Sequence, residues 1–230
     1  MFWRILPILA LILYGLALWH FSAWSLKRQL DGNSRRLRDT RLQPVLDRLA
    51  RALDVPDIPV YVYQVAPVNG LAAPDGRVFL TEGFMEKYRA GEVTPEEIGS
   101  VIAHELGHVA LGHSRRRMID FSGQNALRVL LMTILGRFLP FIGIWLANIL
   151  TTALAARLSR RDEFEADEFA SALMLKAGYG IGPQVSLFRK LDALTKGGGE
   201  GVPAWLLTHP KSPERIAAIE AHATRWTPAP

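Results

Sequence analysis

The sequence contains no cysteine, which excludes disulfides, thiolate metal sites and cysteine nucleophiles. It also lacks an internal repeat, and its glycine run at Gly197–Gly199 lacks the preceding strand and following Lys-Ser/Thr of a phosphate-binding loop. The net charge is +5, but no basic stripe interleaved with aromatic residues accompanies it. The basic residues cluster beside apolar segments instead, which is typical of membrane topology signals. We therefore expect no nucleic-acid partner.

The first apolar segment lies at the N-terminus, where residues 5–24 include no charged residue. As a helix this segment would extend roughly 30 Å, enough to cross a bilayer. We predict an uncleaved transmembrane anchor over residues 1–26, because the bulky residues 21–24 do not form the cleavage site of a signal peptide. The basic residues at 27–41 then place the rest of the chain, residues 27–230, on the cytoplasmic side of an inner membrane.

A second apolar segment, residues 126–156, has arginines on both sides, at Arg115–Arg117 and Arg157–Arg161. Two basic flanks favour the same side of the membrane for both ends, and hence no crossing or two crossings. Two crossings need about 20 residues each and a turn, which is more than this segment offers. We therefore predict an inserted hydrophobic helical hairpin that lies in or dips into the membrane interface. Two crossings of a thinned bilayer and a buried helical pair of the soluble core are the alternatives.

The remaining pattern predicts an α+β domain that is mainly helical and has a small antiparallel sheet. β-branched and aromatic residues indicate strands at 58–65 and 77–81, with a turn at Asp75-Gly76 before the second strand. Helical spacing of apolar residues, caps and stop signals predict the helices. These helices are expected at 36–53, 82–90, from Thr94 to about Met118, 158–177, 184–195 and 213–222.

The segment His104–His108 has the pattern H-E-x-x-H on one of these predicted helices. Positions i and i+4 lie on one face, so His104 and His108 can bind the same zinc ion. Glu105 then lies beside the metal, where it can act as general base toward water. The alternative is a solvated helix face with two ordinary histidines, which the strong helix start at Thr94 disfavours.

A zinc site of this type needs a third protein ligand. Ser114 occupies the metzincin position, and His113 would lie roughly 180° from His104 around a continuous helix. An intramembrane protease of the site-2 type is excluded because Arg115–Arg117 follow the motif directly.

A glutamate from another helix remains as the third ligand. Glu163 and Asp167 are spaced i and i+4, so Glu163 can bind zinc while Asp167 accepts a ring N–H from a ligand histidine. Glu165 points away from this face. An acidic helix segment is more often a solvated surface, so these residues alone leave the choice open.

Several motifs in order resemble the HtpX / CaaX-prenyl-protease family of zinc metallopeptidases over about residues 40–222. The resemblance rests on His104–His108, the apolar segment that follows, Asn69–Gly76, Ser159–Asp167, and His209-Pro210 followed by Arg215.

This resemblance implies a gluzincin-type core with one zinc ion held by His104, His108 and Glu163. Glu105 would be the base and Asp167 would support a ligand. His209 and Arg215 become candidates for steadying the tetrahedral intermediate or arranging the site.

The expected function is a membrane-anchored, zinc-dependent endopeptidase that cleaves polypeptides, above all unfolded or damaged membrane proteins. Its partners would be polypeptide substrates and membrane lipid. We expect the substrate to lie extended against an edge strand near Arg77–Thr81. The alternatives are a non-catalytic membrane chaperone or scaffold, which the presence of Glu105 disfavours, and a processing peptidase for lipidated C-termini, which the short chain disfavours.

Overall fold

The computed structural model describes residues 20–21, 24–25, 27–73, 75–139, 142–196, 209 and 213–226, with side chains except at 114–126, 155 and 192–196. The chain divides into two units, Met1–Ser34 and Arg35–Pro230. The predicted membrane anchor, residues 1–26, lies outside the described residues except for 20–21 and 24–25.

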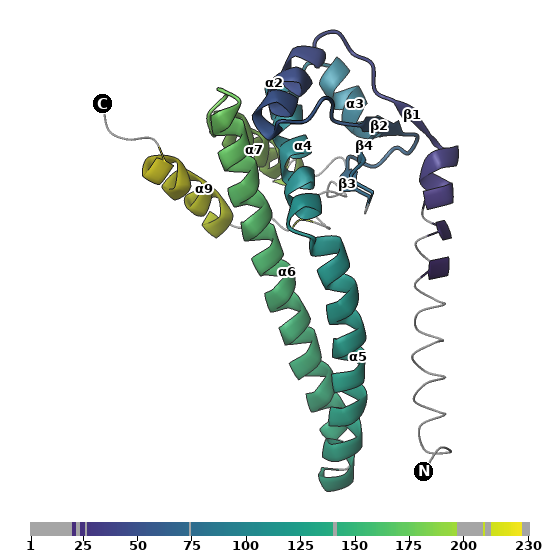
Figure 1. Ribbon diagram of the computed structural model, residues 1–230. Helices are drawn as coiled ribbons and strands as arrows, with labels where there is room; N and C mark the ends of the chain where they lie inside the picture. Colours follow the sequence, from purple (N-terminus) through teal and green to yellow (C-terminus); the bar gives the residue numbers. More distant parts are fainter. Residues whose placement is uncertain are drawn as a thin grey trace. The chain divides into compact units, whose positions relative to one another are not determined.

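A small mixed sheet contains the strands β1 (Ser34–Arg36), β2 (Val60–Tyr63), β3 (Gly70–Ala72) and β4 (Val78–Thr81) in the order β1-β2-β4-β3 (Figure 1). β3 pairs with β4 antiparallel, but β2 and β4 run parallel. The prediction of an antiparallel sheet is therefore wrong for β2 and β4. After β2 the chain first forms β3 at the edge and then turns back into the position between β2 and β3.

This topology also corrects the expected substrate strand. β4 lies inside the sheet, and all of its residues are buried. Its backbone groups pair with strands on both sides, so it cannot pair with a substrate. The edge strand on this side of the sheet is β3.

The first helix, α2 (Gln43–Leu53), begins later than predicted because the preceding residues make other hydrogen bonds. Leu37 N–H donates to the carbonyl of Val60 at 2.9 Å, which extends the sheet pairing. The Asp39 carboxylate accepts from the backbone N–H of Arg41 and Leu42, which forms a turn instead of a helix. The short helix after β4 is α3 (Glu82–Arg89), close to its predicted position.

Helix α4 (Pro95–Ala110) carries the H-E-x-x-H motif. Its predicted start is confirmed, because Thr94 and Glu97 form a reciprocal capping box. The predicted end near Met118 is wrong. Gly112 has φ +67°, a left-handed conformation that ends the helix, and α5 (His113–Phe138) begins directly after it.

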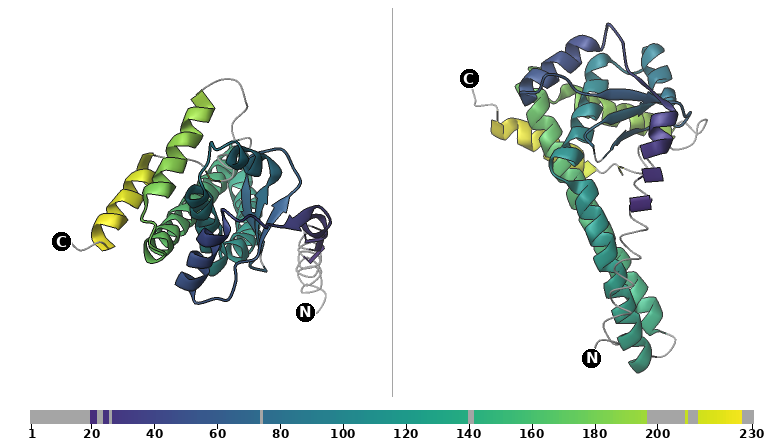
Figure 2. Two further views of the ribbon diagram at one scale, coloured as in Figure 1. Left: turned by 90° about the horizontal axis from the view of Figure 1, so that it is seen from above. Right: turned by 45° about the vertical axis from the view of Figure 1, so that its right-hand side comes forward.

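Helix α6 (Gly143–Lys176) combines two segments that the sequence treated as separate, the second limb of the hairpin and the helix with Glu163. It runs side by side with α5 (Figures 1 and 2). α6 ends before Gly178, which has φ +83°. The described part of the chain is completed by α7 (Gly182–Lys196) and α9 (Pro213–Trp226).

Large apolar side chains are exposed along the α5–α6 hairpin, so the two helices are not a buried pair of the core. The exposed residues are Leu127, Val129, Leu130, Ile134, Phe138, Leu139, Ile142, Ile144, Trp145, Ile149, Leu150 and Leu154. Over the ranges that the structure describes, none of the helices is both apolar and long enough to cross a membrane.

Helix α4 is the central element of the second unit. It packs against α6 and α7 and also contacts β3, β4 and α2 (Figure 1). Its buried residues Ile98, Val101 and Ile102 belong to an apolar core that α2, the sheet, α6 and α7 complete. The histidines of α4 are therefore held between α6 and the edge of the sheet.

Candidate metal centre and active site

His104 and His108 extend from the same face of α4 and are only 2% and 5% exposed. Their Nε2 atoms lie 3.2 Å apart, with the rings nearly perpendicular. This is the arrangement that the i, i+4 spacing predicted.

Glu163 reaches the same point from the neighbouring helix α6. Its Oε2 lies 3.4 Å from His104 Nε2, and its Oε1 lies 3.6 Å from His108 Nε2. Two atoms at tetrahedral positions about 2.1 Å from one ion are roughly 3.4 Å apart. Each ring nitrogen therefore lies near one oxygen of the same carboxylate, at about the spacing that a single small dication requires.

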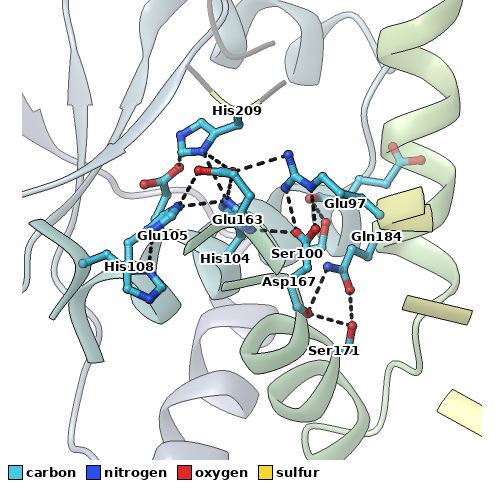
Figure 3. Close-up of polar contacts among 12 residues, drawn as sticks. Glu97, Ser100, His104, Glu105, His108, Glu163, Asp167, Ser171, Gln184 and His209 are labelled. Atoms are coloured by element: carbon cyan, nitrogen blue, oxygen red, sulfur yellow. Dashed lines mark hydrogen bonds and ion pairs between the residues drawn. The ribbon is translucent and has the colours of Figure 1, made fainter. Parts of the chain in front are cut away.

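His209 lies over this cluster, from a segment far along the chain (Figure 3). Its Nδ1 is 2.8 Å from Glu163 Oε2 and 3.3 Å from His104 Nε2. One donor atom each from His104, His108, Glu163 and His209 lie within 4.8 Å of one another, and all four residues are buried. The structure thus places His209 within reach of a metal or of a group bound to it.

Glu105 points toward the same space from α4 (Figure 3). Its side chain is 3% exposed, and its Oε1 accepts no hydrogen bond from the described residues, although His209 Nε2 lies 3.4 Å away. A buried carboxylate oxygen without a donor is costly. A water molecule at the metal would supply that donor, so the Glu105 side chain fits the proposed base.

Asp167 lies behind His104, with its Oδ1 2.9 Å from the ring Nδ1. Arg215 holds this carboxylate with two contacts, from Nε to Oδ2 at 2.6 Å and from Nη2 to Oδ1 at 2.9 Å. Its Nη1 is also 3.3 Å from Glu163 Oε2. The structure therefore places Arg215, which is 2% exposed, behind the donor atoms as a link between two carboxylates.

The backbone of Asp167 is supported as well. Its carbonyl oxygen lies 2.8 Å from the Ser171 hydroxyl and accepts from Gln184 Nε2 at 3.3 Å, while Ser171 also contacts Gln184 (Figure 3). These contacts join α7 to α6 directly beneath the site. Sequence reasoning did not find Ser171 or Gln184, since polar residues on two distant helices give no local signal.

The charges of the site favour a cation at its centre. Burial by itself lowers the pKa of His104, but Asp167 and Glu163 outweigh it and raise this pKa to about 9. Burial raises the pKa of Glu163, but His104 and His209 outweigh it and hold this pKa well below its usual value. A dication would replace the proton that these carboxylates attract.

The sequence missed one further histidine of this region. His113 was excluded as a ligand on the assumption that its helix continues, but α4 ends and His113 returns to lie behind His108. The signal was Gly112, which can end a helix in the left-handed conformation. His113 lies outside the first cluster and forms a second group with Asp162 and Glu165.

Comparison with known proteins agrees with this geometry. Residues 36–223 match peptidase family M48, so the chain belongs to that family. The metalloprotease LoiP of Escherichia coli K12 is 29% identical over 179 residues, which are 78% of this chain and 68% of LoiP. The metalloprotease YcaL of the same organism is 31% identical over 193 residues, 82% of this chain and 73% of YcaL. The protease HtpX of Pseudomonas aeruginosa PAO1 is 27% identical over 218 residues, 79% of this chain and 72% of HtpX.

The chain is accordingly a metalloendopeptidase with a metal cofactor. The buried histidines and glutamate described above are the groups that can hold this metal.

Proposed function

We propose that the chain is a zinc-dependent endopeptidase in which His104, His108 and Glu163 bind one zinc ion. The observation that carries this proposal is the convergence of two imidazole Nε2 atoms and one carboxylate within 3.6 Å, from helices distant in sequence. Nitrogen and carboxylate donors at this spacing suit Zn²⁺.

When bound, zinc supplies a Lewis acid for the scissile carbonyl and lowers the pKa of a water molecule. Glu105 accepts a proton from the attacking water through its Oε1, which has no other donor among the described residues. It then delivers this proton to the leaving amine. His209, 3.4 Å from Glu105, is placed to donate a hydrogen bond to the developing oxyanion.

Asp167 and Arg215 complete the proposal as positioning groups. Asp167 holds the proton of His104 on Nδ1, so that the lone pair of Nε2 faces the metal. Arg215 keeps this carboxylate charged and oriented.

The decisive experiment compares Glu105→Gln with Glu163→Ala. Glu105→Gln should retain the zinc content of the wild type and lose about 10²–10⁴-fold in peptide cleavage, because only the base is removed. Glu163→Ala should lose zinc as well as activity. Zinc is measured by atomic absorption, and cleavage is measured with casein in the presence and absence of a chelator.

Two glutamates on the same helices serve as matched controls. Glu96→Gln on α4 and Glu168→Ala on α6 should leave both zinc content and cleavage unchanged, since neither side chain is part of the cluster. Full activity of Glu105→Gln would refute the proposed base. Full zinc occupancy of Glu163→Ala would refute the proposed ligand.

We further propose that the polypeptide substrate pairs with β3 as an added strand. The carbonyl of Asn69 accepts from Thr81 of β4, and the N–H of Ala73 donates to Arg77 just before β4, so the alternate residue Ala72 presents its backbone groups to the open edge. The N–H of Gly70 donates to the side chain of Asn69 instead. A Cβ atom built on Gly70 would lie 3.5 Å from Glu105 Oε1, so this edge passes beside the base. Main-chain pairing tolerates many sequences, which suits unfolded or damaged proteins as substrates.

Ala72→Pro tests this pairing because it removes an outward N–H group. We expect a higher KM for casein with unchanged zinc content, whereas Ala72→Ser, which keeps the N–H, should resemble the wild type. Equal KM values for both variants would contradict substrate pairing at β3.

The exposed apolar residues of the α5–α6 hairpin support a membrane-associated location. Exposed apolar side chains that gather on one part of a protein mark sites of membrane or partner contact. We propose that the hairpin lies in the membrane interface and brings the site close to membrane substrates.

Because the chain has no cysteine, a single introduced thiol can be labelled selectively. A fluorophore at Ile144→Cys, where the side chain is 49% exposed, should be quenched by acyl-chain-labelled lipids. The same fluorophore at Asp47→Cys, on exposed α2 surface, should not be quenched. Absence of quenching at position 144 would exclude insertion of the hairpin.

A further inference from the structure

His113 is a fully buried histidine that contacts a metal-binding residue without joining the donor cluster. Its Nδ1 lies 2.8 Å from Nδ1 of His108, and its side chain is 1% exposed. Its position depends on Gly112, whose left-handed backbone ends α4 and turns the chain back toward His108. On the far side of the ring, Nε2 lies 3.1 Å from Glu165 Oε2.

The positions of the protons in this chain of contacts follow from one requirement. If His108 binds a metal through Nε2, its remaining proton is on Nδ1. That N–H faces His113 Nδ1 at 2.8 Å, and this nitrogen, as the acceptor, carries a lone pair. The proton of His113 is consequently on Nε2, where it faces the acceptor Glu165. A single assignment of protons satisfies both contacts.

The carboxylate at the end of this chain is itself held in place. Glu165 Oε1 accepts from Arg161 Nε at 2.7 Å, which leaves Oε2 for His113. His104 is likewise backed by a carboxylate and an arginine, but without an imidazole in between. Asp167 contacts His104 directly, and Arg215 binds Asp167. The imidazole of His113 thus takes the place of a carboxylate in direct contact with the ligand.

A second cation site is the competing interpretation, because donor atoms of His113, Asp162 and Glu165 lie within 4.8 Å of one another. A cation on His113 Nε2 would move the ring proton to Nδ1. This proton would then face His108 Nδ1, and His108 would carry its own proton on Nε2 and lose its lone pair for the first metal. The second cation and the first would therefore compete. The Arg161 contact to Glu165 adds positive charge that also disfavours a cation here.

We propose that His113 is a positioning residue that holds His108 in its metal-binding tautomer by accepting the Nδ1 proton and donating its own N–H to Glu165. This inference rests on the proposed role of His108 as a zinc ligand. His113 lies outside the cluster of donor atoms that includes His108.

The experiment compares four variants of the chain, of which Glu165→Leu is the fourth. His113→Leu keeps much of the side-chain volume but removes both hydrogen bonds, and His113→Gln retains an acceptor and a donor. His222→Leu is the matched control, since His222 is a histidine on α9 that contacts Glu168 instead of the cluster. The zinc dissociation constant is measured by chelator competition, and the visible absorption spectrum of the cobalt(II)-substituted protein reports the geometry of the ligands.

We expect His113→Leu to weaken zinc binding by about 10–100-fold and to change the cobalt spectrum, because the orientation of a ligand histidine is lost. His113→Gln should recover most of the affinity and the wild-type spectrum. His222→Leu should match the wild type in both measurements. Glu165→Leu, at a partly exposed position, should show a smaller loss and provides a second test if His113→Leu fails to fold.

Three results would overturn the inference. The first is wild-type zinc affinity in both His113→Leu and Glu165→Leu. The second is an equal loss in His113→Leu and His113→Gln, which would mean that the ring only fills space. The third is a second bound equivalent of zinc that disappears in His113→Leu, which would establish the cation site instead.

A failure of the proposed zinc site itself can be distinguished from these results by the His108→Ala variant. His108→Ala would then retain the full zinc content, whatever the behaviour of the His113 variants.

Discussion

His104 and His108 lie one turn apart on α4, yet the groups behind their rings differ. His104 is backed directly by the carboxylate of Asp167, at 2.9 Å, and Arg215 binds that carboxylate with two contacts. His108 is backed by the imidazole of His113, at 2.8 Å. The first ring thus faces a buried ion pair, and the second faces another ring.

The ion pair behind His108 lies further out. Side-chain exposure is 27% for Glu165 and 73% for Arg161, against 3% for Asp167 and 2% for Arg215. Buried charges must remain paired, whereas exposed pairs contribute little. The two proposed metal ligands can therefore be oriented equally well, while the orientation of His104 depends much more strongly on buried charges than that of His108. The following variants test this difference.

The largest difference is expected in stability, between variants of the two arginines. Arg215→Leu removes the arginine that binds both oxygens of the buried Asp167 carboxylate, so the free energy of unfolding of the metal-free protein should fall by about 3–5 kcal/mol. Arg161→Leu removes a solvent-exposed partner and should leave the urea midpoint unchanged. Similar urea midpoints for the two variants would show that the Asp167–Arg215 and Glu165–Arg161 pairs contribute equally to stability.

The carboxylates should differ in their effect on the metal. Asp167→Asn should weaken zinc binding by about 10–100-fold, since it changes the direct partner of a ligand histidine. Glu165→Gln should weaken it by about two- to fivefold, because exposed charge pairs contribute only about 0–1 kcal/mol. Chelator competition measures both constants, and a larger effect of Glu165→Gln would reverse the comparison.

The pH dependence of zinc binding should also come from His104 and the carboxylates that contact it. Its carboxylates raise the pKa of His104 from 6.5 to about 9, so zinc must displace a proton at neutral pH. Apparent affinity should therefore rise about tenfold per pH unit up to about pH 9. In Asp167→Asn the pKa should fall and the plateau should begin at lower pH, whereas Glu165→Gln should keep the wild-type profile. Titration of the metal-free protein at several pH values would detect the shift.

The smallest effect concerns the turn that positions His113. Gly112→Ala should lower the free energy of unfolding by about 1–2 kcal/mol, because the left-handed conformation disfavours a Cβ atom even where space is free. Gly136→Ala, inside helix α5 and equally free of nearby atoms, should leave stability unchanged or raise it by up to about 1 kcal/mol. A destabilising Gly136→Ala would indicate an effect of the hairpin unrelated to backbone conformation.

Much of this fold follows from local patterns. The capping box at Thr94 and Glu97 is confirmed, and the predicted helices and strands occur, although α2 starts later and α4 ends earlier than expected. The prediction that β2 and β4 pair antiparallel was wrong. Between these two strands in the sequence, the chain forms β3 at the edge of the sheet, so β4 returns parallel to β2. The boundaries failed at residues whose hydrogen bonds go to distant partners, as with Leu37 and Val60.

The sequence alone determined which residues share one face of a helix, namely His104 with His108 on α4 and Glu163 with Asp167 on α6. A helical turn brings residues four positions apart onto one face whatever the rest of the chain does. Only the tertiary structure decided which strand forms the open edge, and that Asp167 lies behind His104 and His113 behind His108. Those contacts join α4 to distant segments, and their distances depend on how the whole core packs.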